Sequence, residues 1–142
     1  MNVELRLPAE WNVAVAADGT TRATSEQHPG VEITTAPMSV VVDRKTEWAR
    51  HMMCQQLGIT ADKLALLVDE KAETVDGWPA WFVVAERRDT AEVSAFAFYY
   101  FLDYSSFATI HGATAGAHLD LLRRARPNYA STDVVALEQL WE

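Results

Sequence analysis

The stretch 93–102 constrains the fold more than any other part of the chain. Apolar or aromatic side chains occupy its odd positions, Val93, Ala95, Ala97, Tyr99 and Phe101, and also its even positions, Phe96, Phe98, Tyr100 and Leu102. A strand without a polar face is typical of a strand that is covered on both sides. The sequence therefore predicts a central strand between two layers, in which Phe98 and Tyr100 are largely buried.

Length and composition fit a single globular domain spanning 1–142. The chain has 142 residues, 49% of them hydrophobic and 23% charged, and a chain of this size can bury roughly two thirds of its unfolded surface. The lone Cys54 cannot form an internal disulfide, and neither a signal peptide nor an apolar run of about 18 residues is present. We therefore expect a cytoplasmic protein without membrane insertion. The net charge of −8 opposes binding to nucleic acid.

The first part of the chain predicts an antiparallel meander followed by a helix. Period-two alternation marks strands, with turns at Asp18-Gly19 and His28-Pro29-Gly30. The strands are 2–7, 11–15, 20–25 and one that begins at 31 and ends near Pro37. Apolar residues then recur at helical spacing over 44–57, with Asp43 suited to the N-cap and Gly58 to the position after the helix.

The second part predicts an aromatic hairpin and a further helix. Strands at 80–88, 93–102 and 106–112 are joined by short connections, so neighbours should be antiparallel. Thr114 suits the N-cap of a helix that ends at Pro127. The sequence does not decide between helix and strand for two segments. For 64–75 we favour a short helical turn and then a strand, and 132–141 fits a strand or a helix equally. The whole pattern predicts an α+β domain with a central antiparallel sheet flanked by helices.

Three features together resemble a known superfamily. They are Pro-Ala-Glu-Trp at 8–11, a helix that carries Trp48, and Val-Asp-Gly-Trp-Pro-Ala at 75–80 leading into the aromatic hairpin. In this order they resemble the PsbP-like superfamily, in particular its bacterial DcrB-like branch. The resemblance implies an α/β/α sandwich. That branch includes small, acidic, cytosolic adaptor chaperones, typically homodimers, that recognise apolar N-terminal segments of effectors exported by bacterial type VI secretion.

No residue pattern points to catalysis, a cofactor or a metal. Among the histidines, His51 lies three residues before Cys54 on the first predicted helix, but two ligands do not make a zinc site. Cys54 as a nucleophile is disfavoured, because no helix N-terminus or basic neighbour is positioned to lower its thiol pKa. The glycines are scattered singly and form no phosphate-binding loop. We therefore predict that the protein is not an enzyme.

The favoured function is a non-catalytic protein-binding module. Trp78 stands in a turn beside Pro79, and Trp141 lies near the C-terminus, so these two are the candidate partner-binding residues. The resemblance extends this prediction to an adaptor chaperone that binds an apolar segment of a secreted effector and forms a homodimer. The alternative is a small-ligand carrier or enzyme with a pocket between sheet and helix, lined by Tyr99, Tyr104, His111 and His118.

Overall fold

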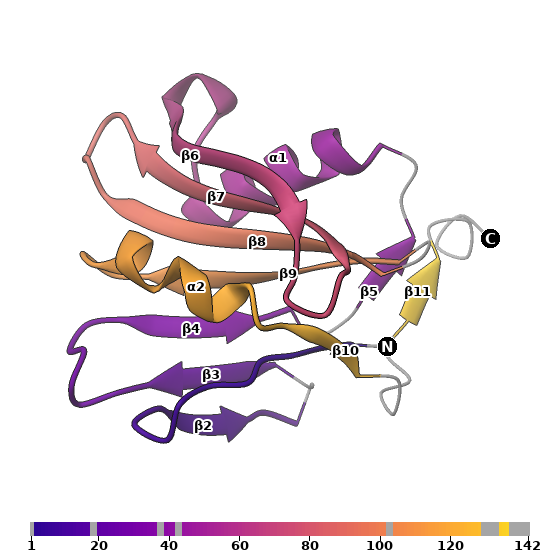
Figure 1. Cartoon of the computed structure of the whole chain (residues 1–142). Helices are drawn as coiled ribbons and strands as arrows, with labels where there is room; N and C mark the ends of the chain where they lie inside the picture. The colour runs from indigo at the N-terminus through magenta and orange to yellow at the C-terminus, as the bar shows by residue number, and fades with distance from the viewer. Residues whose placement is uncertain are drawn as a thin grey trace.

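One large sheet organises the computed structural model, which describes residues 2–17, 20–36, 39–41, 44–101, 104–128 and 134–136. Figure 1 shows the sheet running through the molecule. Its main path, in spatial order, is β2 (Asn12–Val15), β3 (Thr21–Thr24), β4 (Glu32–Thr35), β9 (Tyr104–His111), β8 (Val93–Phe101), β7 (Pro79–Arg87) and β6 (Leu64–Glu73). All neighbours on this path are antiparallel.

Two short strands extend the sheet beside β9, and two others form a separate pair. β5 (Ser39–Val41) pairs with the start of β9, and β11 (Val134–Ala136) runs parallel to β5. These two complete the nine strands of the sheet as described. β1 (Asn2–Glu4) and β10 (Arg126–Asn128) pair with each other in a two-stranded sheet.

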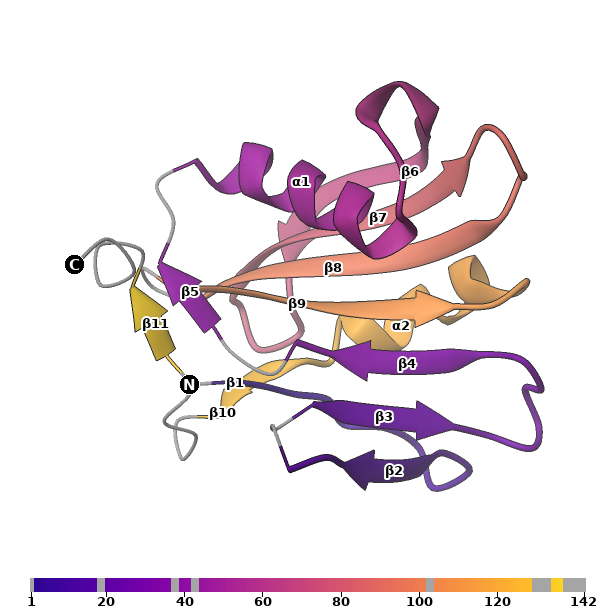
Figure 2. The ribbon, with the colours of Figure 1, turned by 180° about the vertical axis from the view of Figure 1, so that it is seen from behind.

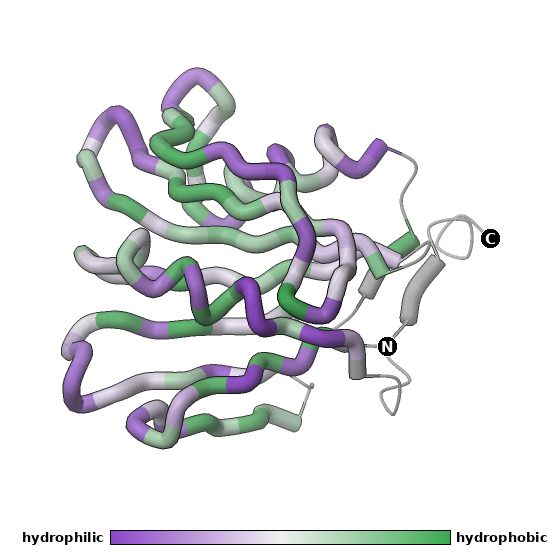
Figure 3. The backbone as a smooth tube through the Cα atoms, in the orientation of Figure 1, coloured by the Kyte–Doolittle hydropathy of each residue, from purple (hydrophilic) through white to green (hydrophobic). Residues whose placement is uncertain are grey.

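Helices cover the two faces of the sheet. α1 (Lys45–Leu57) lies over β7 and β8 on what we call the α1 face. η2 (Ala115–His118) and α2 (Leu119–Leu122) lie on the opposite α2 face, together with the β1–β10 pair (Figures 1 and 2). Figure 3 shows hydrophilic positions gathered at the turns and along the second half of β6. The core therefore forms two layers, one on each side of the sheet.

The prediction of a central strand covered on both faces is confirmed. Ala97, Tyr99 and Phe101 pack in the core of the α2 face, and Phe96 and Phe98 pack beneath α1. Phe98 is fully buried as expected. Tyr100 is only half-buried, because it lines a hollow beside the first turn of α1.

Several predicted elements are present within a few residues of their expected bounds. The meander is β2–β3–β4, the helix is α1 with Gly58 in the left-handed conformation after it, and the aromatic strands are β7, β8 and β9. The open segment 64–75 contains a short 3₁₀ turn, η1 (Ala61–Lys63), followed by β6. Of the open segment 132–141, residues 134–136 are a strand. Asp18-Gly19, Asp43 and Trp141 lie outside the described residues.

Other predictions were wrong in extent. The first strand was expected over 2–7 but is β1, which ends at Glu4 and pairs with β10 rather than joining the main sheet. The helix expected up to Pro127 is one turn of 3₁₀ and one turn of α-helix. It ends early because Arg126 and Pro127 pair with β1 in an extended conformation. β5 and β10 were not predicted.

The longest helix in the described part of the chain is α1, with 13 residues. That length is well below the roughly 20 residues that a membrane-spanning helix needs, and no helix found there is long and apolar enough to cross a bilayer.

Candidate functional site

The four residues predicted to line one pocket do not come together. Tyr99 is fully buried on the α2 face, where its hydroxyl donates a 2.6 Å hydrogen bond to the carbonyl oxygen of Leu122, and burial raises its pKa well above 10. Tyr104 is half-buried against the core of the same face. His111 lies instead in a pocket that the C-terminal end of α1 helps to form. The prediction of one shared pocket is therefore wrong.

His118 belongs to a cluster of rings at the edge of the α2 layer. Its imidazole meets that of His28 edge to face at 4.5 Å between centroids, and Trp11 stacks on His28 at 5.3 Å. Burial, and then the neighbouring His28, lower the pKa of His118. Among the described residues, no group of three or more His, Cys, Asp or Glu side chains is placed to hold a metal ion. The ring contacts of this cluster pack the turn before β4 against η2.

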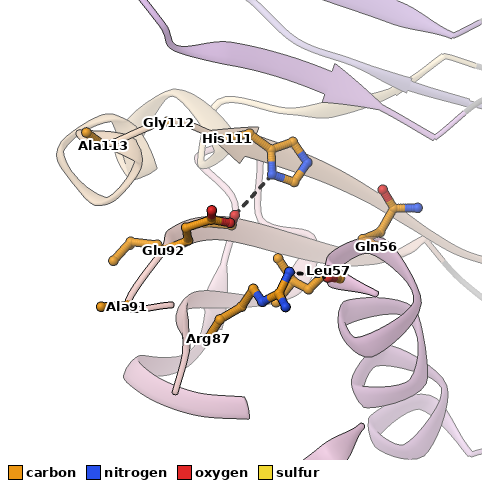
Figure 4. A pocket seen from close by; sticks show the side chains of 10 residues that line it. Gln56, Leu57, Arg87, Ala91, Glu92, His111, Gly112 and Ala113 are labelled. Atoms are coloured by element: carbon orange, nitrogen blue, oxygen red, sulfur yellow. Dashed lines mark hydrogen bonds between the residues drawn. The ribbon is translucent and has the colours of Figure 1, made fainter. Parts of the chain in front are cut away.

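The pocket at His111 opens between the end of α1 and the ends of β7, β8 and β9 (Figure 4). Its volume is about 490 Å³. One wall is fixed by Arg87, whose guanidinium donates to the Leu57 carbonyl oxygen at 3.2 Å and to Asp89 at 3.0 Å. The lining residues are Gln56, Leu57, Arg87, Ala91, Glu92, Val93, Ser94, His111, Gly112 and Ala113.

Strand register places an acid, a histidine and a serine in one row beside this pocket. His111 on β9 lies opposite Glu32 on β4 and opposite Ser94 on β8. The Ser94 hydroxyl and Nδ1 of His111 are 3.0 Å apart. Burial lowers the pKa of His111 while Glu32 acts in the opposite, weaker sense, so the neutral form of the ring is favoured. Since Ser94 is only 5% exposed, its hydroxyl is poorly placed for nucleophilic attack, whereas the half-buried ring of His111 lines the pocket and can hydrogen-bond a ligand.

A second concave surface lies at the other end of α1, beside the β6–β7 hairpin. We call it the hollow, and its volume is again about 490 Å³. The aromatic rings of Trp81 and Tyr100 are among the groups that border it. Its lining residues are Lys45, Thr46, Lys71, Ala72, Glu73, Pro79, Ala80, Trp81 and Tyr100.

Cations lie over the aromatic rings of the hollow. The ammonium of Lys45 is 5.3 Å from the ring centroid of Tyr100, and that of Lys71 is 5.6 Å from the ring centroid of Trp81. Arg50 approaches the Trp81 ring as well, at 5.7 Å. Cations over ring faces are attracted by the ring quadrupole. Trp81 is held in place by a 2.6 Å hydrogen bond from its indole N–H to Asp69, and burial raises the pKa of Tyr100 to about 12.

Lys45 and Lys71 are two of the three lysines in the chain. Within the described residues, neither ammonium has a carboxylate oxygen within 4.0 Å, although the net charge is −8. Each cation is thus engaged by an aromatic ring and remains able to pair with an anionic group from outside.

Trp78 lies in the β6–β7 turn, one residue before the first residue of β7 that lines the hollow. It is half-buried, its ring packs edge-on against Phe101 at 5.4 Å, and its backbone N–H donates to the Thr74 hydroxyl at 3.1 Å. The ring belongs to the core of the α2 face, whereas the next residue, Pro79, lines the hollow. A partner-binding role for Trp78 stays a prediction, and the same role for Trp141 falls outside the described residues.

The sequence did not single out Lys45, Lys71, Ser94 or Glu32. The relevant signals were the scarcity of lysine and the strand register, and the register requires knowledge of which strands pair.

Comparison with protein-family models gives no match to this chain, and no curated protein matches it. What the protein binds must therefore be inferred from its own surfaces.

Proposed function

We propose that the protein is a non-catalytic binding module that holds a segment of another polypeptide in the hollow. The observation that carries this proposal is the aromatic border of the hollow, overlain by two lysines without a carboxylate partner among the described residues. Aromatic side chains dominate the binding energy of protein interfaces. A partner segment with apolar side chains and a nearby carboxylate would match this surface.

The resemblance to DcrB-like adaptor chaperones supports a more specific version of the proposal. In that version the protein is a PsbP-like α/β/α sandwich that acts in the bacterial cytoplasm on an apolar segment of a secreted effector. The placement of α1 on one face and of η2 and α2 on the other is compatible with such layers. The apolar lining from Pro79, Ala80, Trp81 and Tyr100 suits a segment of this kind.

Blocking the hollow tests the proposal. Thr46 is exposed in the first turn of α1 and lines the hollow, so T46W should fill it and abolish capture of the partner from the native cell. Gln55 is exposed on the last turn of the same helix, outside the residues that line the hollow, so Q55W serves as the matched control. Equal capture by T46W and Q55W, with both variants folded, would exclude the hollow as the partner site.

A second candidate function rests on the His111 pocket. The Ser94–His111 hydrogen bond and the side chain of Gln56 give this pocket polar groups suited to a small polar ligand. Native mass spectrometry of the purified protein should then show a bound small molecule that is lost in H111A. A spectrum without adducts from protein purified from its native cell counts against this carrier function.

A further inference from the structure

We infer that β6 pairs with β6 of a second copy of this chain, with Asp69 opposite Lys71 of the partner subunit. The inference does not rest on the partner segment proposed for the hollow, although it pairs Lys71, one of the two lysines that overlie the hollow, with a carboxylate. It concerns the edge of the sheet, and it follows from the backbone hydrogen bonds and the charges of β6.

β6 is an open edge. It is the last strand on the path of the sheet and pairs with β7 on one side only, as far as the described residues show. The hydrogen bond from Thr74 N–H to the Trp78 carbonyl oxygen, 2.8 Å, sets the phase of the ladder. In an antiparallel pair the bonded positions alternate. The N–H and C=O groups of Asp69, Lys71 and Glu73 therefore point away from β7.

The usable part of this edge is short and bounded at both ends. A β-bulge interrupts the register between Leu66 and Val68. At the other end, the backbone N–H of Val75 donates to the Arg123 carbonyl oxygen at 2.9 Å, which occupies the edge beyond Glu73. Another strand can pair only with the residues between these limits.

Two-fold symmetry and charge together select one register. A two-fold axis perpendicular to the sheet places one residue of β6 opposite the same residue of the second copy. If that residue is Glu70, Asp69 lies opposite Lys71 of the partner subunit. Both residues offer outward backbone groups, so they form a hydrogen-bonded pair. Their side chains lie on the α1 face, where both contact Trp81. A shift by two residues in pairing places Asp69 opposite Asp69 or Lys71 opposite Lys71, which like charges disfavour. A shift by four places Lys71 opposite Glu73, but it leaves only residues 71–73 of each strand between the two limits.

The side chains on the other face of β6 are compatible with the same register. Val68 is 39% exposed and comes to lie opposite the partner's Ala72, an apolar cross-strand pair. The two Glu70 side chains meet at the axis. Each Glu70 already forms an ion pair with Arg123 of its own chain, which offsets their mutual repulsion.

This arrangement makes one continuous sheet from two subunits. An axis perpendicular to the sheet keeps the two α1 faces on the same side. The two hollows, each bordered by Lys71 and Glu73 of β6, then lie on one face of the dimer on either side of the axis.

Charge exchange tests the register. The wild type should be a dimer in sedimentation equilibrium, and D69K and K71D should each be monomeric at the same concentration, because each places like charges opposite one another. An equimolar mixture of D69K and K71D should restore the dimer, since opposite charges meet again at both positions. K63D is the control, because the third lysine lies in η1, outside the edge, and it should remain dimeric.

Crosslinking gives a second readout, needed if the loss of the Trp81–Asp69 hydrogen bond unfolds D69K. In a C54S background, E70C places two thiols opposite each other at the axis, at a Cα separation of about 4.5 Å, which a disulfide can span. Oxidation should link most of the E70C protein into dimers, and V15C, at the opposite sheet edge, should remain unlinked. A monomeric wild type, a monomeric mixture of folded variants, or unlinked E70C would each overturn the inference.

Discussion

Phe98 ties the layer of α1 to the sheet. It is fully buried, and its ring lies within 6 Å, between centroids, of Trp48, Trp81 and Phe107. Phe98→Ala should lower the free energy of unfolding by about 3–5 kcal/mol through lost burial and a residual cavity. Urea denaturation would measure this, with Val15→Ala as the control, since Val15 is 71% exposed. Equal midpoints for the two variants would contradict the central position of Phe98.

His111 should make stability depend on pH. Burial lowers the pKa of its ring below the usual 6.5, so the unfolded chain binds a proton more readily than the folded protein does. The resulting stability is fully present above pH 6.5 and declines as the pH falls through that value towards the folded pKa. The thermal midpoint should therefore drop between pH 7 and pH 5, and the drop should be smaller in H111Q. His118 shifts in the same direction, so H111Q should retain part of the dependence.

Individual site residues were only partly predictable. His111 lines a pocket whereas Tyr99 is fully buried, and alternation could not distinguish the two, because it shows that two faces exist and not which of them has a cavity. Tyr99 faces η2 and α2, and its hydroxyl donates a hydrogen bond to the carbonyl oxygen of Leu122. Ser94 precedes His111 by 17 positions, and only the β8–β9 register brings the two side chains together.

At the level of elements, the junction after β9 depends on a glycine. Gly112 has φ +134°, and a Cβ there would lie 2.5 Å from the Gly30 carbonyl oxygen in the turn before β4. G112A should therefore lower the free energy of unfolding by more than the roughly 1 kcal/mol expected from backbone preference alone. Gly58 provides the comparison, since it has φ +67° and nothing lies within 4 Å of its Cβ position. If G58A costs as much as G112A in urea denaturation, the close contact with Gly30 has no energetic weight.

The elements that the sequence predicted well have strong local patterns. α1 has helical apolar spacing and ends at Gly58, and the aromatic hairpins have alternation together with short turns. β5 and β10 have three residues each, and their partners β9 and β1 are distant in sequence. Strands of that length carry too little periodicity to be recognised and form because tertiary pairing favours them.

At the scale of the whole molecule, the two-layered architecture was implied by β8 alone. A strand that is apolar on both faces requires cover on both, and α1 and α2 provide it. The docking of the meander was not implied, because β4 joins the aromatic strands through β9 across a long sequence separation. That pairing creates the row of Glu32, His111 and Ser94. The position of β6 at the edge of the sheet, in contrast, could be anticipated, because β6, β7, β8 and β9 are neighbours in the sheet in the same order as in the sequence.

Association through β6 should also appear in the stability of the molecule. A partner that binds only the folded form stabilises it by mass action, by about 2.7 kcal/mol at one hundred times the dissociation constant. The thermal midpoint of the wild type should therefore rise with protein concentration. That of K71D should stay constant, because its Asp69 would face a like charge across the axis. Added salt should reduce the rise for the wild type, since charges at an exposed edge are screened. A wild-type midpoint independent of concentration, measured by calorimetry from low to high micromolar protein, would show that two copies do not share this edge.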